Sequence, residues 1–178
     1  MTPIVGVMGS GTDEHVECAR PLGALIASLG VHLLTGGGGG VMRAVSRAFT
    51  GCDGRRGVCI GVLPCVSEDD RRSPKPGYPN EFVEIAIRTH LPFSGARGAG
   101  DLSRNHINIL SSAAIVALPG GAGTRSEVDL ALRYGTPLVG FALEPSLLAA
   151  FPASIPRVHH IGDVERFLTA ALSLCPEH

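Results

Sequence analysis

The stretch Ala114-Ile-Val-Ala-Leu118, followed by Pro119-Gly-Gly-Ala-Gly123 and Thr124-Arg-Ser-Glu127, decides the fold class of this chain. Its five apolar residues in a row predict a strand that is buried on both faces. The glycines predict a tight turn, and residues 125–134 predict a helix that ends at Gly135. A buried strand that leads through a glycine turn into a helix is typical of parallel α/β sheets.

The same alternation continues toward both ends of the chain. We predict strands at 4–8, 31–35, 58–63, 82–87, 114–118 and 138–142, and helices at 14–28, 41–49, 102–111, 125–134 and 164–174. No repeat or linker interrupts the pattern, and no apolar run is long enough to cross a membrane. The sequence therefore predicts one domain over residues 1–178. We expect an α/β fold, a single doubly wound Rossmann-like domain with a central parallel sheet flanked by helices.

Composition excludes several classes of function. The formal net charge is −1, which speaks against a dedicated nucleic-acid binder, and the chain has no Trp for base stacking. Lys75 is the only lysine among the 15 cationic residues, and it lies in a proline-containing loop. Schiff-base enzymes and P-loop ATPases both need a lysine placed in the site, so neither is expected. A bound anion would have to be held by backbone amides and arginine.

The cysteines give no sign of a metal site or of disulfides. The five cysteines form no Cys-x-x-Cys pair and have no histidine at zinc spacing. Their odd number, and an N-terminus without a basic targeting segment, favour reduced thiols in a cytoplasmic protein. We interpret them as small buried side chains, with a catalytic cysteine as the less favoured alternative.

Three glycine clusters follow predicted strands, and together they predict a phosphate site. They are Gly9 with Gly11, the run 36–40, and Gly120, Gly121 and Gly123. The carboxyl ends of parallel strands meet at one edge of the sheet, where helix N-termini offer free N–H groups to an anion. A dinucleotide is not favoured. Glu14 stands where the third glycine of G-x-G-x-x-G belongs, and no carboxylate follows the second strand at Thr35.

Two charged residues are candidates for chemistry at this edge. Thr124-x-x-Glu127 matches a capping box, in which the carboxylate only satisfies helix N–H groups, but the same carboxylate could face a ligand's ribose. The sequence leaves both readings open. Arg104 and Asn108, four residues apart, share one helix face, where the arginine either pairs with a phosphate or lies on the surface. His106 is expected to pack or cap rather than to act as a base.

Residues 119–127 resemble the P-G-G-x-G-T-x-x-E signature of the LOG (Lonely Guy) family. The similarity extends to the opening Gly-Ser turn, to residues 35–42 and to residues 62–64. Enzymes of that family hydrolyse the N-glycosidic bond of nucleoside 5′-monophosphates and release the base and ribose 5-phosphate. Their catalytic residues are the signature glutamate and an arginine 15 residues before the signature proline. The resemblance therefore implies Glu127 and Arg104 as a catalytic pair that needs no cofactor and no metal.

The resemblance also implies which residues bind the phosphorylated ligand. These are Gly9, Ser10, Gly11, Thr35, Gly36, Gly37, Gly38, Gly39, Met42, Arg104, Asn105, Asn108, Pro119, Gly120, Gly121, Gly123 and Thr124. It further implies a homodimer or homotetramer. The apolar residues Val128, Leu130, Ala131 and Leu132 are consistent with such an assembly.

Three departures from the LOG pattern resemble a sister branch instead. The helix motif M-H-x-R-K reads Asp101-Leu-Ser-Arg-Asn105 here, Ala122 stands where an aromatic residue is common, and the glycine turn before Met42 is one residue short. That branch includes the molybdenum-cofactor carrier proteins, which bind a phosphorylated pterin without chemistry. We therefore predict a nucleoside 5′-monophosphate phosphoribohydrolase. The alternative is a non-catalytic carrier of a phosphorylated small molecule such as molybdenum cofactor.

Overall fold

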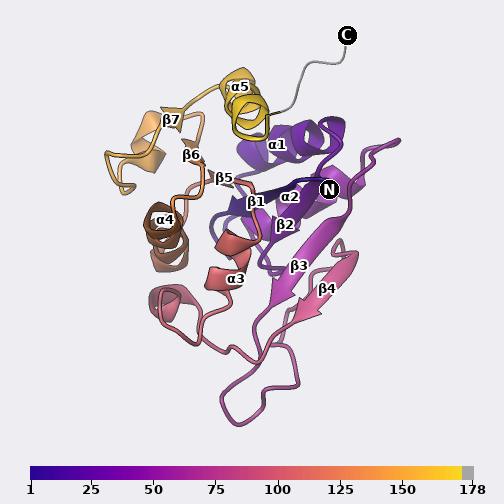
Figure 1. The fold of residues 1–178 in the computed structure, drawn as a ribbon, viewed down its shortest axis with the longest axis vertical. Coiled ribbons are helices and arrows are strands. Elements are labelled where there is room, and N and C mark those ends of the chain that lie inside the picture. The colour runs from indigo at the N-terminus through magenta and orange to yellow at the C-terminus, as the bar shows by residue number, and fades with distance from the viewer. Residues whose placement is uncertain (174–178) are drawn as a thin grey trace.

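A seven-stranded parallel sheet forms the centre of the computed structural model, which describes residues 1–173 (Figure 1). Its strand order is β4-β3-β2-β1-β5-β6-β7. The strands are β1 (Ile4–Met8), β2 (His32–Thr35), β3 (Cys59–Leu63), β4 (Ile85–Arg88), β5 (Ala114–Ala117), β6 (Leu138–Phe141) and β7 (Arg157–Val158). The helices are α1 (Val16–Ser28), α2 (Val41–Thr50), α3 (Asn105–Leu110), α4 (Ala122–Tyr134) and α5 (Ile161–Ala171), with 3₁₀ turns η1 (Gly95–Arg97) and η2 (Pro145–Leu148).

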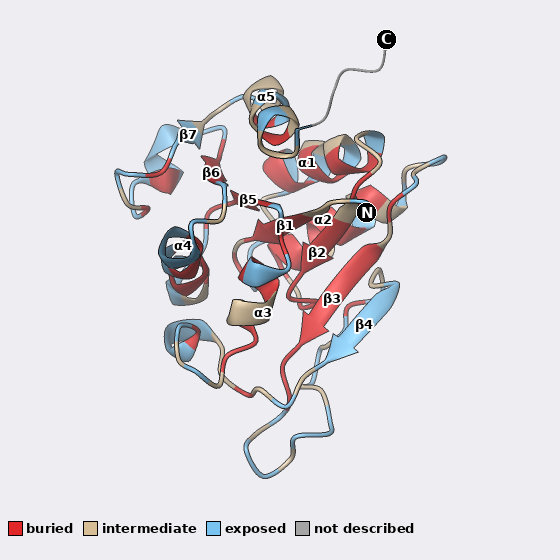
Figure 2. Ribbon diagram, in the orientation of Figure 1, coloured by how far each residue is buried: buried red, intermediate tan, exposed pale blue. Residues whose placement is uncertain are grey.

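Helices cover both faces of the sheet, because the side chains of its inner strands are apolar in both directions. Val5 and Val7 of β1 pack in one core with α1, α2 and α5, whereas Met8 packs in a second core with α3 and α4. Strand β3 is buried along its length, but the edge strand β4 is exposed (Figure 2). The predicted doubly wound α/β fold is confirmed.

Several element boundaries differ from the sequence prediction. Helix α3 is shorter than residues 102–111, and α4 begins at Ala122 rather than at residue 125. The strand predicted at 82–87 starts only at Ile85, because Asn80 accepts hydrogen bonds from the N–H groups of Phe82 and Val83 and holds that segment in a turn. Strand β7 and both 3₁₀ turns were not predicted. The end of the helix predicted at 164–174 lies outside the described residues.

Strands β1 to β4 are added to the sheet in one direction and strands β5 to β7 in the other, and the candidate site lies between β1 and β5, where the direction switches. The chain leaves β1 toward α1 on one face and leaves β5 toward α4 on the other, so the two turns diverge at the carboxyl edge. A hydrogen bond of 3.0 Å from the Ser10 N–H to the Pro119 carbonyl joins the two turns. Ligands of such sheets bind in the crevice that opens at this kind of switch point.

A third turn joins the same edge through Gly40, the residue before α2. The N–H of Val41 donates to the Ser10 carbonyl over 2.9 Å, which brings the start of α2 against the turn after β1. Gly40 has a φ of 57°, and a Cβ there would overlap the Ser10 carbonyl. Only glycine fits this approach, so Gly40 allows the two turns to pack together.

Part of the apolar surface of α4 packs within this chain. Val128, Leu130 and Ala131 are buried in the core, and Leu132 alone of the four residues cited for self-association is exposed. The core thus uses three of these four residues, whereas Leu132 and Tyr134 remain exposed on α4. The expected homodimer or homotetramer stays a prediction.

The described cysteines are free thiols. Cys18, Cys59 and Cys65 are buried and Cys52 is half-buried, whereas Cys175 lies outside the described residues. Burial raises the pKa of the Cys59 thiol to about 11, which keeps that thiol protonated and unreactive at neutral pH. None of the helices in residues 1–173 is long and apolar enough to cross a membrane.

Candidate functional site

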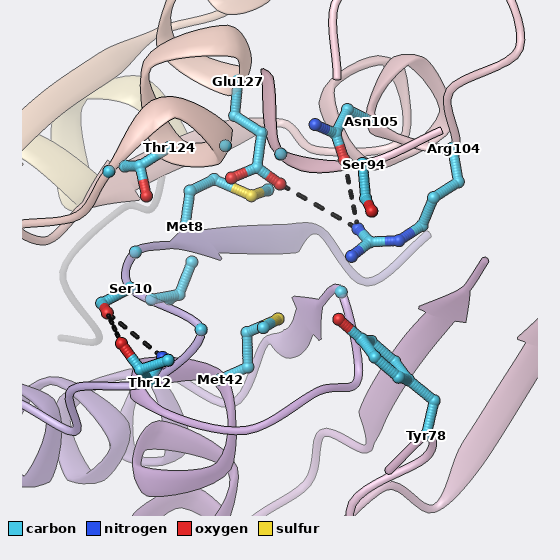
Figure 3. A pocket seen from close by; sticks show the side chains of 17 residues that line it. Met8, Ser10, Thr12, Met42, Tyr78, Ser94, Arg104, Asn105, Thr124 and Glu127 are labelled. Atoms are coloured by element: carbon cyan, nitrogen blue, oxygen red, sulfur yellow. Dashed lines mark hydrogen bonds and ion pairs between the residues drawn. The ribbon is translucent and has the colours of Figure 1, made fainter. Parts of the chain in front are cut away.

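A cavity of about 290 Å³ opens at the switch point, between the turns that follow β1, β2 and β5 (Figure 3). Eleven of the residues implied by the sequence line it: Gly9, Ser10, Gly11, Gly36, Met42, Arg104, Asn105, Gly121, Gly123, Thr124 and Glu127. They come from turns and helix starts that are far apart in the chain. The fold thus brings the three glycine clusters and the two charged candidates to one place.

Other residues of the predicted set shape the turns without lining the cavity. Thr35 Oγ1 accepts a hydrogen bond of 3.0 Å from the Gly37 N–H. The carbonyls of Gly37 and Gly38 hold the backbone and side chain of Asn80. The remaining ones, Gly39, Asn108, Pro119 and Gly120, also lie outside the cavity lining.

Arg104 and Glu127 face each other at one end of the cavity. Arg104 Nη1 lies 4.0 Å from Glu127 Oε1 and donates to Asn105 Oδ1 over 3.3 Å. Both charged side chains are buried, the arginine at 4% exposure and the glutamate at 8%. The guanidinium fits only because residue 36 is glycine, since a Cβ there would overlap it. The surface reading of Arg104 is therefore wrong.

Burial makes the Glu127 carboxyl titrate near neutral pH. Removal from water raises its pKa to about 7, and the opposing effects of Arg104 and of the nearby Asn108 amide are smaller. The Asn108 amide is close enough to favour the carboxylate, yet neither of its polar atoms makes a hydrogen bond of ordinary geometry. Arg104 Nε is likewise buried without an acceptor. Unpaired buried polar atoms of this kind indicate a place where a ligand or water completes the hydrogen bonding.

Glu127 does not cap its helix. The residue before α4 is Gly121, so Thr124 lies inside the first turn and Glu127 one turn along, and no side chain caps the helix start. The capping-box reading is wrong because the helix begins three residues earlier than the pattern suggests. The carboxylate instead points into the cavity, toward Arg104 (Figure 3).

Two further sequence expectations have clear outcomes. His106 contacts the Tyr134 hydroxyl over 2.7 Å and the Gly100 carbonyl over 3.2 Å, which is the packing role expected of it. Lys75 is closer to the site than its loop suggested. Its Nζ donates to the hydroxyl of Ser94, a residue of the cavity wall. A lysine therefore contacts the cavity wall at Ser94, although it does not line the cavity itself.

Sequence reasoning missed six lining residues: Val7, Met8, Thr12, Tyr78, Ser94 and Gly95. Val7, Met8 and Thr12 flank the first glycine turn, so proximity to that turn was a usable signal. Tyr78 and Ser94 come from long loops, and no local pattern places them here. Within residues 1–173, no group of three His, Cys, Asp or Glu side chains could hold a metal ion.

Comparison with known proteins gives one family and solved structures that match nearly the whole chain. The model of the SLOG cluster4 family matches residues 2–168. An uncharacterised protein of Archaeoglobus fulgidus is 33% identical over 133 residues, which are 74% of each chain. The molybdenum cofactor binding protein of the phototrophic bacterium Rippkaea orientalis is 29% identical with a TM-score of 0.73, over 97% of this chain and 98% of its own. The molybdenum cofactor carrier protein MCP of Chlamydomonas reinhardtii is 30% identical with a TM-score of 0.73, over 97% of this chain and 99% of its own.

Proposed function

Because this chain belongs to the SLOG cluster4 family, within the LOG-like superfamily, we propose that it is a non-catalytic carrier of a phosphorylated pterin, the molybdenum cofactor. The observation that carries the proposal is the likeness, over nearly the whole chain, to two proteins that bind or carry this cofactor. The three departures from the LOG signature, at residue 105, at residue 122 and before Met42, point the same way.

The start of α4 suits the phosphate of such a ligand. The first N–H groups of α4 have no partner within the helix, and Gly121 and Gly123 leave them uncovered. The Thr124 hydroxyl lies beside them, and the Ser10 hydroxyl accepts hydrogen bonds from the N–H groups of Thr12 and Asp13. The α4 N–H groups and the Thr124 hydroxyl are neutral donors that would hold an anion without a lysine in contact with it, whereas the Ser10 hydroxyl donates to the Asp13 carboxylate over 3.3 Å.

The rest of the cavity suits a flat ring with polar edges. Val7, Met8 and Met42 give apolar walls, and thioethers adapt well to ring faces. Arg104 lines the cavity, and its Nε is buried without a partner among residues 1–173, so a pterin edge could supply the missing acceptor. The molybdenum is cargo held by the ligand's own atoms, so this chain needs no metal-binding side chains for it.

Cofactor retention tests the proposal. Molybdenum cofactor released from a molybdoenzyme is mixed with the chain without oxygen, passed through a gel-filtration column, and measured as molybdenum and pterin per chain. We expect about one of each per chain to co-elute. Elution of the chain without molybdenum and pterin would contradict the proposal.

A second candidate function is hydrolysis of nucleoside 5′-monophosphates, and one observation favours it. Glu127 is free of any capping role and lies 4.0 Å from Arg104 inside the cavity, as a carboxyl that exchanges a proton near pH 7. Such a carboxyl can act on the ribose or on attacking water while the arginine orients the nucleotide. Incubation with AMP separates the two functions, because a hydrolase releases adenine that chromatography detects. A Glu127→Gln variant that keeps the full rate would remove Glu127 from that role.

A further inference from the structure

Lys75 ties together the two long loops that form one end of the cavity. Its Nζ donates to the Pro92 carbonyl over 2.9 Å and to Ser94 Oγ over 3.0 Å. Its backbone carbonyl accepts from the N–H of Tyr78 over 3.1 Å. Both Ser94 and Tyr78 line the cavity, so this half-buried lysine fixes two of its wall residues at once.

The contact with Lys75 orients the Ser94 hydroxyl. Because Ser94 Oγ accepts a hydrogen bond from an ammonium group, its own hydrogen has to point elsewhere. That hydrogen is not used to cap η1, and no acceptor for it is found among residues 1–173. Since Ser94 lines the cavity, the hydroxyl is available as a donor to a ligand atom.

Positive charge gathers around this hydroxyl without matching negative charge. Burial and the positive charges of Arg104 and Arg97 lower the pKa of Lys75, and Cys65 opposes them. In the described part of the chain, neither Lys75 nor Arg97 pairs with a carboxylate, and Arg97 lies over the Phe93 ring at 4.1 Å. The one carboxyl paired with Arg104, Glu127, is partly neutral at pH 7. A cationic cluster that is half-buried favours an anionic ligand atom beside it.

We propose that Lys75 is the positioning residue of an oxyanion subsite at this end of the cavity, where it presents the Ser94 hydroxyl beside Arg104 to an oxygen-rich anionic group of the ligand. Figure 3 shows Ser94, Arg104 and Tyr78 at the opposite end from Thr124 and Ser10. The inference rests on the proposed function in taking this cavity as the ligand site. It adds that the ligand is held at both ends by oxyanion contacts.

Variants at Lys75 and Ser94 test the subsite through cofactor binding. We expect Lys75→Met to weaken retention at least about tenfold, and Lys75→Arg, which keeps the charge and the donors, to restore it to within about threefold. Ser94→Ala should also weaken retention. Because both residues act through one contact, the double variant Lys75→Met/Ser94→Ala should retain the cofactor as well as the more impaired of the two single variants does. Arg72→Met removes an exposed charge from the same loop and serves as the matched control. Retention by Lys75→Met within about twofold of the unmodified chain would overturn the proposal.

Comparing the cofactor with and without its metal shows which of its groups occupies the subsite. If the metal's oxo groups occupy the subsite, Lys75→Met weakens only the metal-loaded form. If the phosphate occupies it, both forms weaken equally. Equal retention of both forms by the variant and the unmodified chain would again overturn the proposal.

A second measurement needs neither a variant nor the cofactor. Because Lys75 is the only lysine, a chain labelled with ¹³C-lysine gives a single side-chain NMR signal, whose pH titration reports the Lys75 pKa. We expect saturating molybdate or inorganic phosphate to raise this pKa by at least about half a unit, since an anion favours the charged form. A pKa unchanged by either anion would overturn the proposal. Failure of cofactor retention together with a raised pKa would instead reject the carrier function and keep the subsite.

Discussion

At the scale of single residues, Glu127 decides what the cavity can do. The sequence offered a helix cap or a ligand contact for this carboxyl, and the cap is excluded by the early start of α4 at Ala122. Its surroundings are apolar enough to raise its pKa to about 7, although Arg104 lies 4.0 Å away. A carboxyl that is half-protonated at pH 7 makes both ligand binding and folding depend on pH.

The first prediction concerns the stability of Glu127→Gln. A folded-state pKa of about 7, above the ordinary 4.5 of a glutamate, means that the folded chain binds the proton more tightly than the unfolded chain does. This group's contribution to the free energy of unfolding therefore falls as pH rises from about 4.5 to about 7. As the pH rises from 5 to 8, the free energy of unfolding of the variant should increase by about 2 kcal/mol relative to that of the unmodified chain. Urea unfolding at both pH values measures the difference. The exposed Glu165→Gln is the control, and an equal change in both variants would refute the prediction.

The second prediction concerns Gly36→Ala. Its Cβ would overlap the Arg104 guanidinium, so the arginine has to leave its place beside Glu127. We expect binding of the phosphorylated ligand to weaken by at least about tenfold, because a charge-assisted contact is lost. The control is Gly162→Ala on α5, where a Cβ meets only the end of a flexible arginine. Isothermal titration of both variants with the phosphorylated ligand measures the change in affinity. An unchanged affinity of Gly36→Ala would contradict a ligand site beside Arg104.

At the scale of elements, the start of α4 shows how a motif can be recognised while its geometry is misjudged. The residues Thr124-x-x-Glu127 match the sequence pattern of a capping box, yet the helix extends back through Gly123 and Ala122 to a Gly121 N-cap. This places the Thr124 side chain on the cavity wall, with no hydrogen bond to the helix end. The element therefore presents a hydroxyl and free N–H groups to the ligand together.

Thr124→Val tests this placement and is the third prediction. Loss of a true N-cap destabilises a helix by about 1 kcal/mol, but Thr124 caps nothing here. We expect the free energy of unfolding to stay within about 0.5 kcal/mol of the unmodified chain, while affinity for the phosphorylated ligand falls about tenfold. Urea unfolding measures the free energy of unfolding, and isothermal titration measures the affinity for the phosphorylated ligand. A loss of stability of about 1 kcal/mol or more, as for a lost helix cap, would restore the capping reading.

At the scale of the whole molecule, the cavity depends on both halves of the sheet. The turns after β1 and β2 belong to one half, the starts of α3 and α4 to the other, and the loops with Tyr78 and Ser94 close one end. A ligand that contacts all of them binds only the folded chain. Its binding energy therefore adds to the stability of the entire domain.

The fourth prediction follows from this linkage. At a free ligand concentration of about 100 times Kd, the chain should gain about 2.7 kcal/mol of stability. For a chain of this length, that gain corresponds to a rise in Tm of about 5 to 10 °C. Scanning calorimetry with and without molybdenum cofactor measures the shift, and Gly36→Ala, whose affinity is at least about tenfold weaker, should show about half of it or less at the same ligand concentration. An unchanged Tm at saturating cofactor would contradict a site at the switch point.

The sequence by itself determined the alternation of buried strands and helices, and therefore the doubly wound sheet. It also placed the three glycine turns, Arg104 and Glu127 at one sheet edge, because these features depend on local apolar runs and on the rule that parallel strands end together. Only the tertiary structure decided that Glu127 faces Arg104 instead of capping α4, and that Tyr78 and Ser94 line the same cavity. It also decided that Lys75 donates to Ser94. Those outcomes depend on burial and on contacts between segments far apart in the chain, which no local pattern encodes.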